Sequence, residues 1–159
     1  MLDTERRELD DEARALAPGG FVELTNGQVH FELAGRGDSP VVVLVHGFSV
    51  PSFIWEPTAE VLVSHGFRVL RYDLFGRGYS DRPDVAYDRT LFVEQLGELL
   101  VELGIEEPVD LVGLSMGGAV VASFTFAYPE RVDRLVLVDP FVGPADAGVV
   151  SVPGLGDYL

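Results

Sequence analysis

The sequence predicts a single α/β domain with a mostly parallel, doubly wound sheet and an antiparallel hairpin at its N-terminal end. Three observations predict this fold class. From residue 41 onward, β-branched apolar runs alternate with segments of helical periodicity, as in consecutive βαβ units. Two segments with apolar–polar alternation flank Asn26-Gly27, which is a strong hairpin signal. The length of 159 residues suits one domain.

The elements follow in order along the chain. Residues 1–20 are an acidic arm that could form a frayed helix before Pro18-Gly19-Gly20. The run VVVLV is continuous, as in a strand covered on both faces. From Pro140 onward glycine and proline recur, and we expect no regular element. The expected strands are 21–24, 28–34, 41–45, 67–73, 109–113 and 134–139, and the expected helices are 58–65, 90–103 and 116–127.

Composition excludes some classes of function. The formal net charge is −15, from 26 acidic residues against 11 basic ones, all arginine. This charge repels phosphate backbones and anionic lipid surfaces, so we expect no nucleic-acid partner. The chain has no cysteine, which excludes disulfides and thiolate chemistry. No signal peptide is recognisable and no apolar run approaches the about 18 residues of a membrane span, so we expect a cytoplasmic protein.

One serine occupies a distinctive position between the expected strand at 109–113 and the helix at 116–127. Gly113, Ser115 and Gly117 form the pattern G-x-S-x-G. In a nucleophile elbow this pattern places the serine on a sharp turn with its hydroxyl exposed, and the glycines avoid clashes between Cβ atoms and nearby backbone. The helix that follows brings free N–H groups to the same place. We therefore predict an elbow centred on Ser115.

With this elbow, the chain resembles the α/β-hydrolase superfamily, in its esterase and lipase-like branch. The resemblance covers roughly residues 21–145 and implies that residues 146–159 begin a lid region. It also implies that the sheet is incomplete at its C-terminal edge, because we expect six strands where the fold usually has eight. The segments that carry the resemblance are VVVLVHGF, GFRVLRYDLFGRGYSDRP, VDLVGLSMGGAVV and PERVDRLVLVDP.

The resemblance implies roles for individual residues. Ser115 matches the nucleophile, and the backbone N–H groups of Phe48 and Met116 match the two donors of an oxyanion hole. Ser49, Trp55 and Met116 could line an acyl site, although packing in the core is the simpler role for Trp55.

The same resemblance disfavours some of the reactions known in the superfamily. Dehalogenases and epoxide hydrolases of the superfamily carry aspartate at the elbow, and proline iminopeptidases carry a His-Gly-Gly-Pro-Gly loop, whereas this chain has serine and His-Gly-Phe-Ser. Hydrolysis of a small carboxylic ester, acyl or lipid-like, is the leading function. Hydrolysis of a carbon–carbon bond is an alternative, and a non-catalytic remnant or interaction protein of the same fold is another. No metal or organic cofactor is implied.

The base that a serine nucleophile needs has no obvious source. The three histidines, His30, His46 and His65, all precede Ser115, whereas the family order is Ser, then Asp or Glu, then His. We expect His30 to lie far from the site and His46 to hydrogen-bond within the oxyanion loop, which leaves His46 a weak candidate base. Asp139 is a candidate acid, although an Asp-Pro turn explains it more simply.

Three further expectations concern the remaining charged residues and the edge of the sheet. The acidic residues Asp73, Asp81 and Asp84 are too scattered for a metal loop, so we expect Arg77 and Asp81 to pair or cap locally. The missing base and the short strand count indicate the N-terminal part of a larger hydrolase, with little turnover of its own. Its last strand would leave an unpaired apolar edge that permits self-association.

Overall fold

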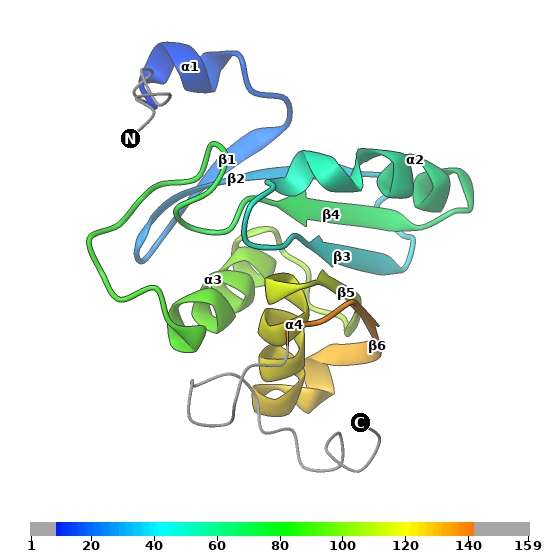
Figure 1. The fold of residues 1–159 in the computed structure, drawn as a ribbon. Helices are drawn as coiled ribbons and strands as arrows, with labels where there is room; N and C mark the ends of the chain where they lie inside the picture. The colour runs from blue at the N-terminus through cyan, green and yellow to red at the C-terminus, as the bar shows by residue number, and fades with distance from the viewer. Residues whose placement is uncertain (1–8, 142–159) are drawn as a thin grey trace.

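The computed structural model describes residues 9–141, which form a six-stranded sheet with helices on both faces (Figure 1). The strand order is β1-β2-β4-β3-β5-β6. The first two pairings, β1–β2 and β2–β4, are antiparallel, and the other three are parallel, which confirms the predicted fold class. The strands are β1 Gly20–Leu24, β2 Gly27–Ala34, β3 Val41–Val45, β4 Arg68–Tyr72, β5 Val109–Leu114 and β6 Val132–Val138.

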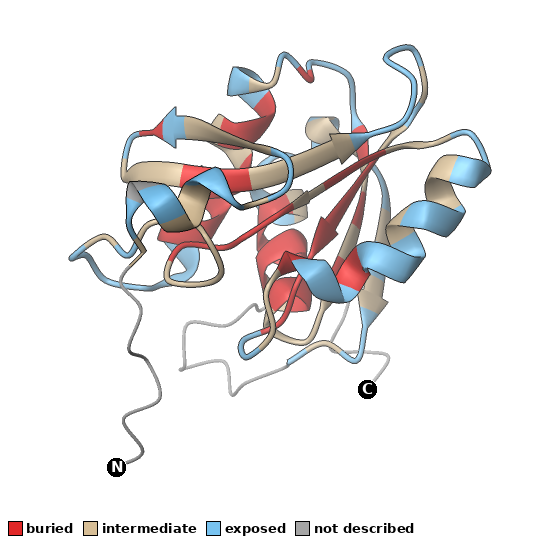
Figure 2. Ribbon diagram, turned by 90° about the horizontal axis from the view of Figure 1, so that it is seen from above, coloured by how far each residue is buried: buried red, intermediate tan, exposed pale blue. Residues whose placement is uncertain are grey.

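The helices divide between the two faces of the sheet. On one face, α2 (Glu56–Ser64) and Trp55 cover β3 and β4. On the other, α3 (Arg89–Glu102) and α4 (Met116–Ala127) pack on the main core. Figure 2 shows that the buried residues lie along the central strands and on the inner faces of these helices. A short helix, α1 (Asp11–Ala15), lies in the N-terminal arm.

The element boundaries differ from the predicted ones by a few residues, for local reasons. A 3₁₀ turn, η1 (Ser52–Trp55), precedes α2, and Pro57 in the first turn of α2 favours a start earlier than predicted. A second 3₁₀ turn, η2 (Pro129–Arg131), leads directly into β6. The predicted lid region at residues 146–159 lies outside the described residues.

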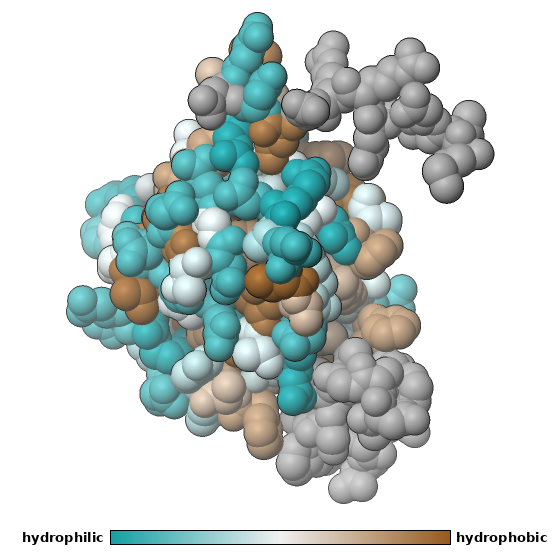
Figure 3. All heavy atoms as spheres, turned by 90° about the vertical axis from the view of Figure 1, so that its left-hand side faces the viewer, coloured by the Kyte–Doolittle hydropathy of each residue, from teal (hydrophilic) through white to brown (hydrophobic). Residues whose placement is uncertain are grey.

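The strand β6 lies at an edge of the sheet. It pairs with β5 and with no other strand of residues 9–141. Val136 and Val138 on this strand remain 49% and 39% exposed, so apolar surface reaches the edge. By contrast, the face shown in Figure 3 is mostly hydrophilic, with hydrophobic residues in small groups. Within the described part of the chain, no helix is long and apolar enough to cross a membrane.

Candidate active site

Ser115 lies at the junction of β5 and α4, in the backbone conformation expected of an elbow. Its φ of 51° and ψ of −116° are uncommon for a residue with a side chain. The Ser115 N–H donates to the Val138 carbonyl at 3.0 Å, and the Ser115 carbonyl accepts from the N–H groups of Gly118 and Phe141 at 2.9 and 3.0 Å. The backbone at Ser115 is thus fixed by β6 and α4, and the side chain is left partly exposed.

The two elbow glycines are required by close contacts with backbone. A Cβ on Gly113 would lie 2.6 Å from the carbonyl carbon of Gly117, and one on Gly117 would lie 2.5 Å from the carbonyl oxygen of His46. Real Cβ atoms essentially never approach other atoms so closely. The pattern G-x-S-x-G therefore follows from the packing of α4 against β5 and against the end of β3.

The loop after β3, residues 46–51, which the resemblance predicts to be the oxyanion loop, lies against Ser115. Because β3 and β5 are parallel neighbours, with Val45 opposite Gly113, the residues that follow both strands meet at one rim. A Cβ built on Gly47 would lie 3.3 Å from the Cβ of Ser115 and 3.9 Å from its Oγ. The N–H groups of Phe48 and Met116 donate to no other group of residues 9–141. Two amides next to the serine are thus available to an acceptor.

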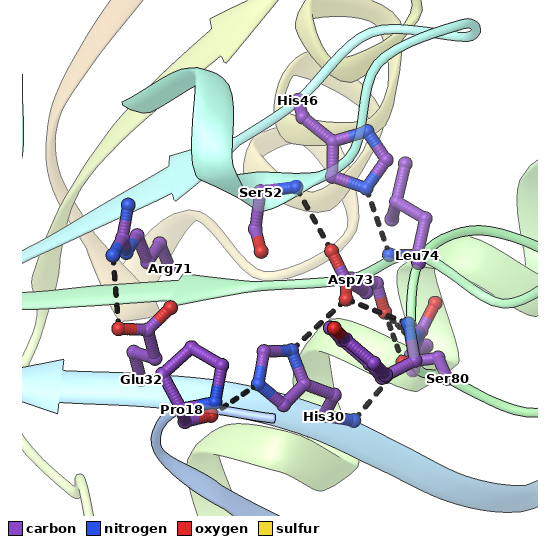
Figure 4. Close-up of polar contacts among 12 residues, drawn as sticks. Pro18, His30, Glu32, His46, Ser52, Arg71, Asp73, Leu74 and Ser80 are labelled. Carbon is purple, nitrogen blue, oxygen red and sulfur yellow. Dashed lines mark hydrogen bonds and ion pairs between the residues drawn. The ribbon is translucent and has the colours of Figure 1, made fainter. Parts of the chain in front are cut away.

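His46 is occupied on both ring nitrogens and is fully buried. Its Nε2 accepts from the Leu74 N–H at 3.0 Å (Figure 4), which places the ring proton on Nδ1. Nδ1 donates to the Gly47 carbonyl at 2.7 Å. Burial is the main cause that lowers the pKa of His46. Because the ring has no nitrogen left to accept the Ser115 proton, His46 is not the base. It hydrogen-bonds within the loop, as predicted.

A buried network lies beneath the same loop. The Asp73 carboxylate, directly after β4, accepts from the Ser52 N–H at 2.8 Å, the Tyr79 N–H at 3.0 Å and His30 Nδ1 at 2.9 Å. His30 Nε2 lies 2.5 Å from the Pro18 carbonyl oxygen. Both nitrogens of His30 therefore face acceptors, which favours the imidazolium form (Figure 4).

The pKa shifts of the pair agree with this geometry. Burial alone would lower the pKa of His30, but its bonds to Asp73 and Pro18 and the nearby carboxylates raise it above 6.5. Burial alone would raise the pKa of Asp73, but the hydrogen bonds from His30, Ser52 and Tyr79 lower it. The expectation that His30 lies far from the site was wrong. The antiparallel pairing of β2 with β4, which sequence periodicity does not reveal, brings His30 beside Asp73.

The remaining candidates have structural positions. His65 caps the end of α2, where Nδ1 bonds to the Val61 carbonyl, so none of the three histidines bonds to Ser115 within residues 9–141.

Asp139 is exposed at φ 43°, a conformation that aspartate tolerates in turns. Trp55 is 7% exposed and packs against Val42, Leu44 and Val69. No three His, Cys, Asp or Glu side chains gather as metal ligands in the part of the chain described.

The expectation that Arg77 and Asp81 pair with each other was wrong, although Arg77 also makes a local bond, from Nη1 to the Gly76 carbonyl at 3.3 Å. Asp81 pairs with Arg14 of the N-terminal arm and accepts from the Gln28 N–H. Arg77 reaches the oxyanion loop, where its Nε donates to the Phe48 carbonyl at 2.7 Å and its guanidinium lies 4.5 Å from the centre of the Phe48 ring. Both contacts join segments far apart in sequence, and no local pattern signals them.

Comparisons with known proteins agree with this fold. The alpha/beta hydrolase fold family matches residues 40–155, which is most of the chain, so the protein belongs to the α/β-hydrolase family. It is 32% identical over 121 residues to the carboxylesterase YbfK of Bacillus subtilis, a match that covers 76% of this chain. It is 33% identical over 119 residues to a 2-hydroxymuconate semialdehyde hydrolase of a Pseudomonas species, covering 73% of this chain.

A solved structure supports the same relationship. A thermophilic esterase from Thermogutta terrifontis superposes with a TM-score of 0.73 at 32% identity, over 79% of this chain and 47% of that one. The chain spans 40% of the length of YbfK and 42% of the Pseudomonas hydrolase. The matches therefore concern less than half of each relative.

Proposed function

We propose that this chain carries the nucleophile and the oxyanion hole of a hydrolase that acts on small carboxylic esters. The supporting observation is the strained backbone of Ser115 beside two amides, at Phe48 and Met116, that donate to no other group of residues 9–141. The similarity to a carboxylesterase and to a solved esterase favours an ester as substrate.

In the proposed reaction, the Ser115 oxygen attacks the ester carbonyl, and its proton passes to a base. The carbonyl oxygen becomes an oxyanion, which accepts hydrogen bonds from the Phe48 and Met116 amides, while the N-terminus of α4 adds its positive end. Collapse of the intermediate breaks the bond to the alcohol and leaves an acyl-serine, which water then hydrolyses.

The base is the part of this reaction that residues 9–141 do not supply. All three histidines of the chain lie within these residues, and each hydrogen-bonds to a group other than Ser115. We therefore propose that the acid and the base come from sequence outside these 159 residues, and that this polypeptide alone has little turnover. A non-catalytic remnant of the same fold is the alternative that this gap favours.

Labelling of Ser115 tests the proposal. A fluorophosphonate should attach slowly to the wild-type chain, with loss of fluoride and formation of a phosphorus–oxygen bond at Ser115. Intact-mass spectrometry should find the adduct on the wild-type chain and none on Ser115→Ala. Absence of labelling in the folded wild-type chain, or equal labelling of both, would contradict the proposed nucleophile.

Ester turnover tests the assignment of His46. The purified chain should hydrolyse a short p-nitrophenyl ester barely faster than buffer, because its hydroxyl has no base. Robust hydrolysis that His46→Ala abolishes would instead make His46 the base.

A second candidate function is hydrolysis of a carbon–carbon bond. The similarity to 2-hydroxymuconate semialdehyde hydrolase favours it. Comparing a p-nitrophenyl ester with a 2-hydroxymuconate semialdehyde, on a longer protein that includes this sequence, would decide between the two candidates.

The exposed edge of the sheet leads to a separate proposal, that the chain self-associates through β6. Val136 and Val138 would lose water contact if a second copy paired there. Sedimentation should show dimers or larger species that Val136→Lys disperses, and a wild-type chain that stays monomeric would exclude this contact.

A further inference from the structure

Arg77 contacts the oxyanion loop through two kinds of interaction. Its Nε donates to the Phe48 carbonyl at 2.7 Å, and its guanidinium lies over the Phe48 ring at 4.5 Å. The Phe48 ring is otherwise 66% exposed, so no core packing fixes it. Arg77 itself is set in a turn held by hydrogen bonds from its N–H to Leu74 and from Ser80 to its carbonyl.

The backbone of Phe48 is fixed from both sides. The peptide plane before its Cα contains the Gly47 carbonyl, which accepts from His46, and the Phe48 N–H, which points the opposite way in a trans peptide. The plane after its Cα contains the Phe48 carbonyl, which accepts from Arg77. The Phe48 N–H lies in the first plane, and holding the second plane as well restrains the Phe48 Cα that the two planes share.

We propose that Arg77 is a positioning residue that aims the Phe48 N–H at the oxyanion through its hydrogen bond to the Phe48 carbonyl and its contact with the Phe48 ring. This inference rests on the proposed hydrolase function. Arginine suits the role because its planar group can donate in its own plane while it stacks on an aromatic face. Without Arg77, the Phe48 Cα would be held only through the bond from His46 to the Gly47 carbonyl, and the plane that contains the Phe48 N–H would tilt over a wider range.

The nearby Arg82 provides a matched control. It belongs to the same segment and carries the same charge, but it donates to the Ser80 and Gly78 carbonyls and not to residues 46–49. Arg77→Met and Arg82→Met therefore remove equal charge from one segment, and only the first removes a contact with the oxyanion loop. Arg77→Lys keeps a donor for the Phe48 carbonyl but loses the planar group.

Backbone NMR relaxation tests the positioning directly. The order parameter of the Phe48 amide should fall from about 0.85 to below about 0.6 in Arg77→Met, remain unchanged in Arg82→Met, and recover partly in Arg77→Lys. A Phe48 amide that stays rigid in Arg77→Met would overturn the inference, and so would equal loosening in both methionine variants, which would indicate a general effect on the segment.

The rate of fluorophosphonate labelling tests the consequence for Ser115. We expect Arg77→Met to label about tenfold more slowly than the wild type and Arg82→Met to match it, since small misplacements of oxyanion donors slow such reactions. Equal rates in all three would overturn the role of Arg77 and leave the proposed function intact. A different outcome would separate the two proposals. If the wild type is not labelled but the Phe48 amide loosens in Arg77→Met, the hydrolase function is contradicted and the placement of Phe48 by Arg77 is retained.

Discussion

Two segments meet at the candidate site, and they are held in place by different physical means. The elbow around Ser115 is held by backbone hydrogen bonds and by close packing at Gly113 and Gly117, where a side chain would not fit. The oxyanion loop is held mainly by polar side chains, His46, Asp73 and Arg77.

This difference predicts which substitutions destabilise each segment. The elbow should respond to added volume and tolerate changes of charge, because atoms of the main chain surround it. The oxyanion loop should respond to lost charge and to pH, because its supports are ionisable or charged groups: His46 within the loop, and Asp73 and Arg77 on the segment after β4. Substitutions in the two segments therefore separate sensitivity to added volume from sensitivity to charge and pH.

The largest effect is expected at Asp73, the charged support of the loop. In Asp73→Asn, one amide oxygen replaces two carboxylate oxygens where three donors converge, and the imidazolium of His30 loses its partner. Breaking a buried pair in this way should lower the free energy of unfolding by about 3–5 kcal/mol. Urea denaturation of the variant measures this loss.

Asp38→Asn is the control for that substitution. Asp38 pairs with Arg36 at the surface, where the two side chains are 76% and 84% exposed. We expect a change within about 0.5 kcal/mol, as for most surface positions. If the two variants were equally stable, the buried network would contribute nothing to the folded state.

A smaller effect is expected at the elbow. Gly117→Ala places a methyl group 2.5 Å from the His46 carbonyl oxygen, and both atoms belong to rigid segments. Overpacking of this kind costs about 1–3 kcal/mol, measured by the same urea titration. Gly37→Ala is the control, because nothing lies within 4 Å of its added methyl group. A Gly117→Ala variant as stable as Gly37→Ala would show that α4 shifts freely away from β3.

The difference between the elbow and the oxyanion loop also explains which features could be predicted from sequence. The six strands, the helices on both faces and the elbow were predictable, because they depend on local periodicity and on glycines next to a single serine. The strand order of β2, β4 and β3 was not predicted, because periodicity along the chain does not say which strands pair. The boundaries of α2 and β6 were off by two residues, where 3₁₀ turns lead into both elements.

The supports of the oxyanion loop were the part that sequence could not supply. Asp73 was visible as an acid at a strand end, but its partner His30 lies 43 positions earlier in the chain and becomes a neighbour only through the antiparallel pairing of β2. Arg77 reaches Phe48 across 29 positions. Contacts of this kind depend on tertiary geometry, and a single sequence carries no record of them.

The smallest expected effect is the pH dependence of stability, because two buried histidines act in opposite directions. The raised pKa of His30 gives stability that is fully present below pH 6.5 and is lost as pH rises through the folded pKa. The lowered pKa of His46 costs stability as pH falls below 6.5, because the unfolded chain then binds a proton that the folded chain does not. The two effects act in adjacent pH windows, so stability falls on both sides of pH 6.5 in the wild type.

Removing His30 should therefore abolish the loss of stability above pH 6.5 and leave the loss below pH 6.5, which comes from His46. We expect the stability of His30→Gln to fall less than that of the wild type as pH rises from 6.5 to 8, in urea titrations at each pH. In the wild type, NMR titration of the imidazole C–H signals should place His30 above pH 6.5 and His46 below it. A His30 signal that titrates below 6.5 would mean that its second nitrogen is unprotonated in the folded chain. One of its two bonds, to Asp73 or to Pro18, would then be absent, and the loop would rest on Asp73 without a buried cation.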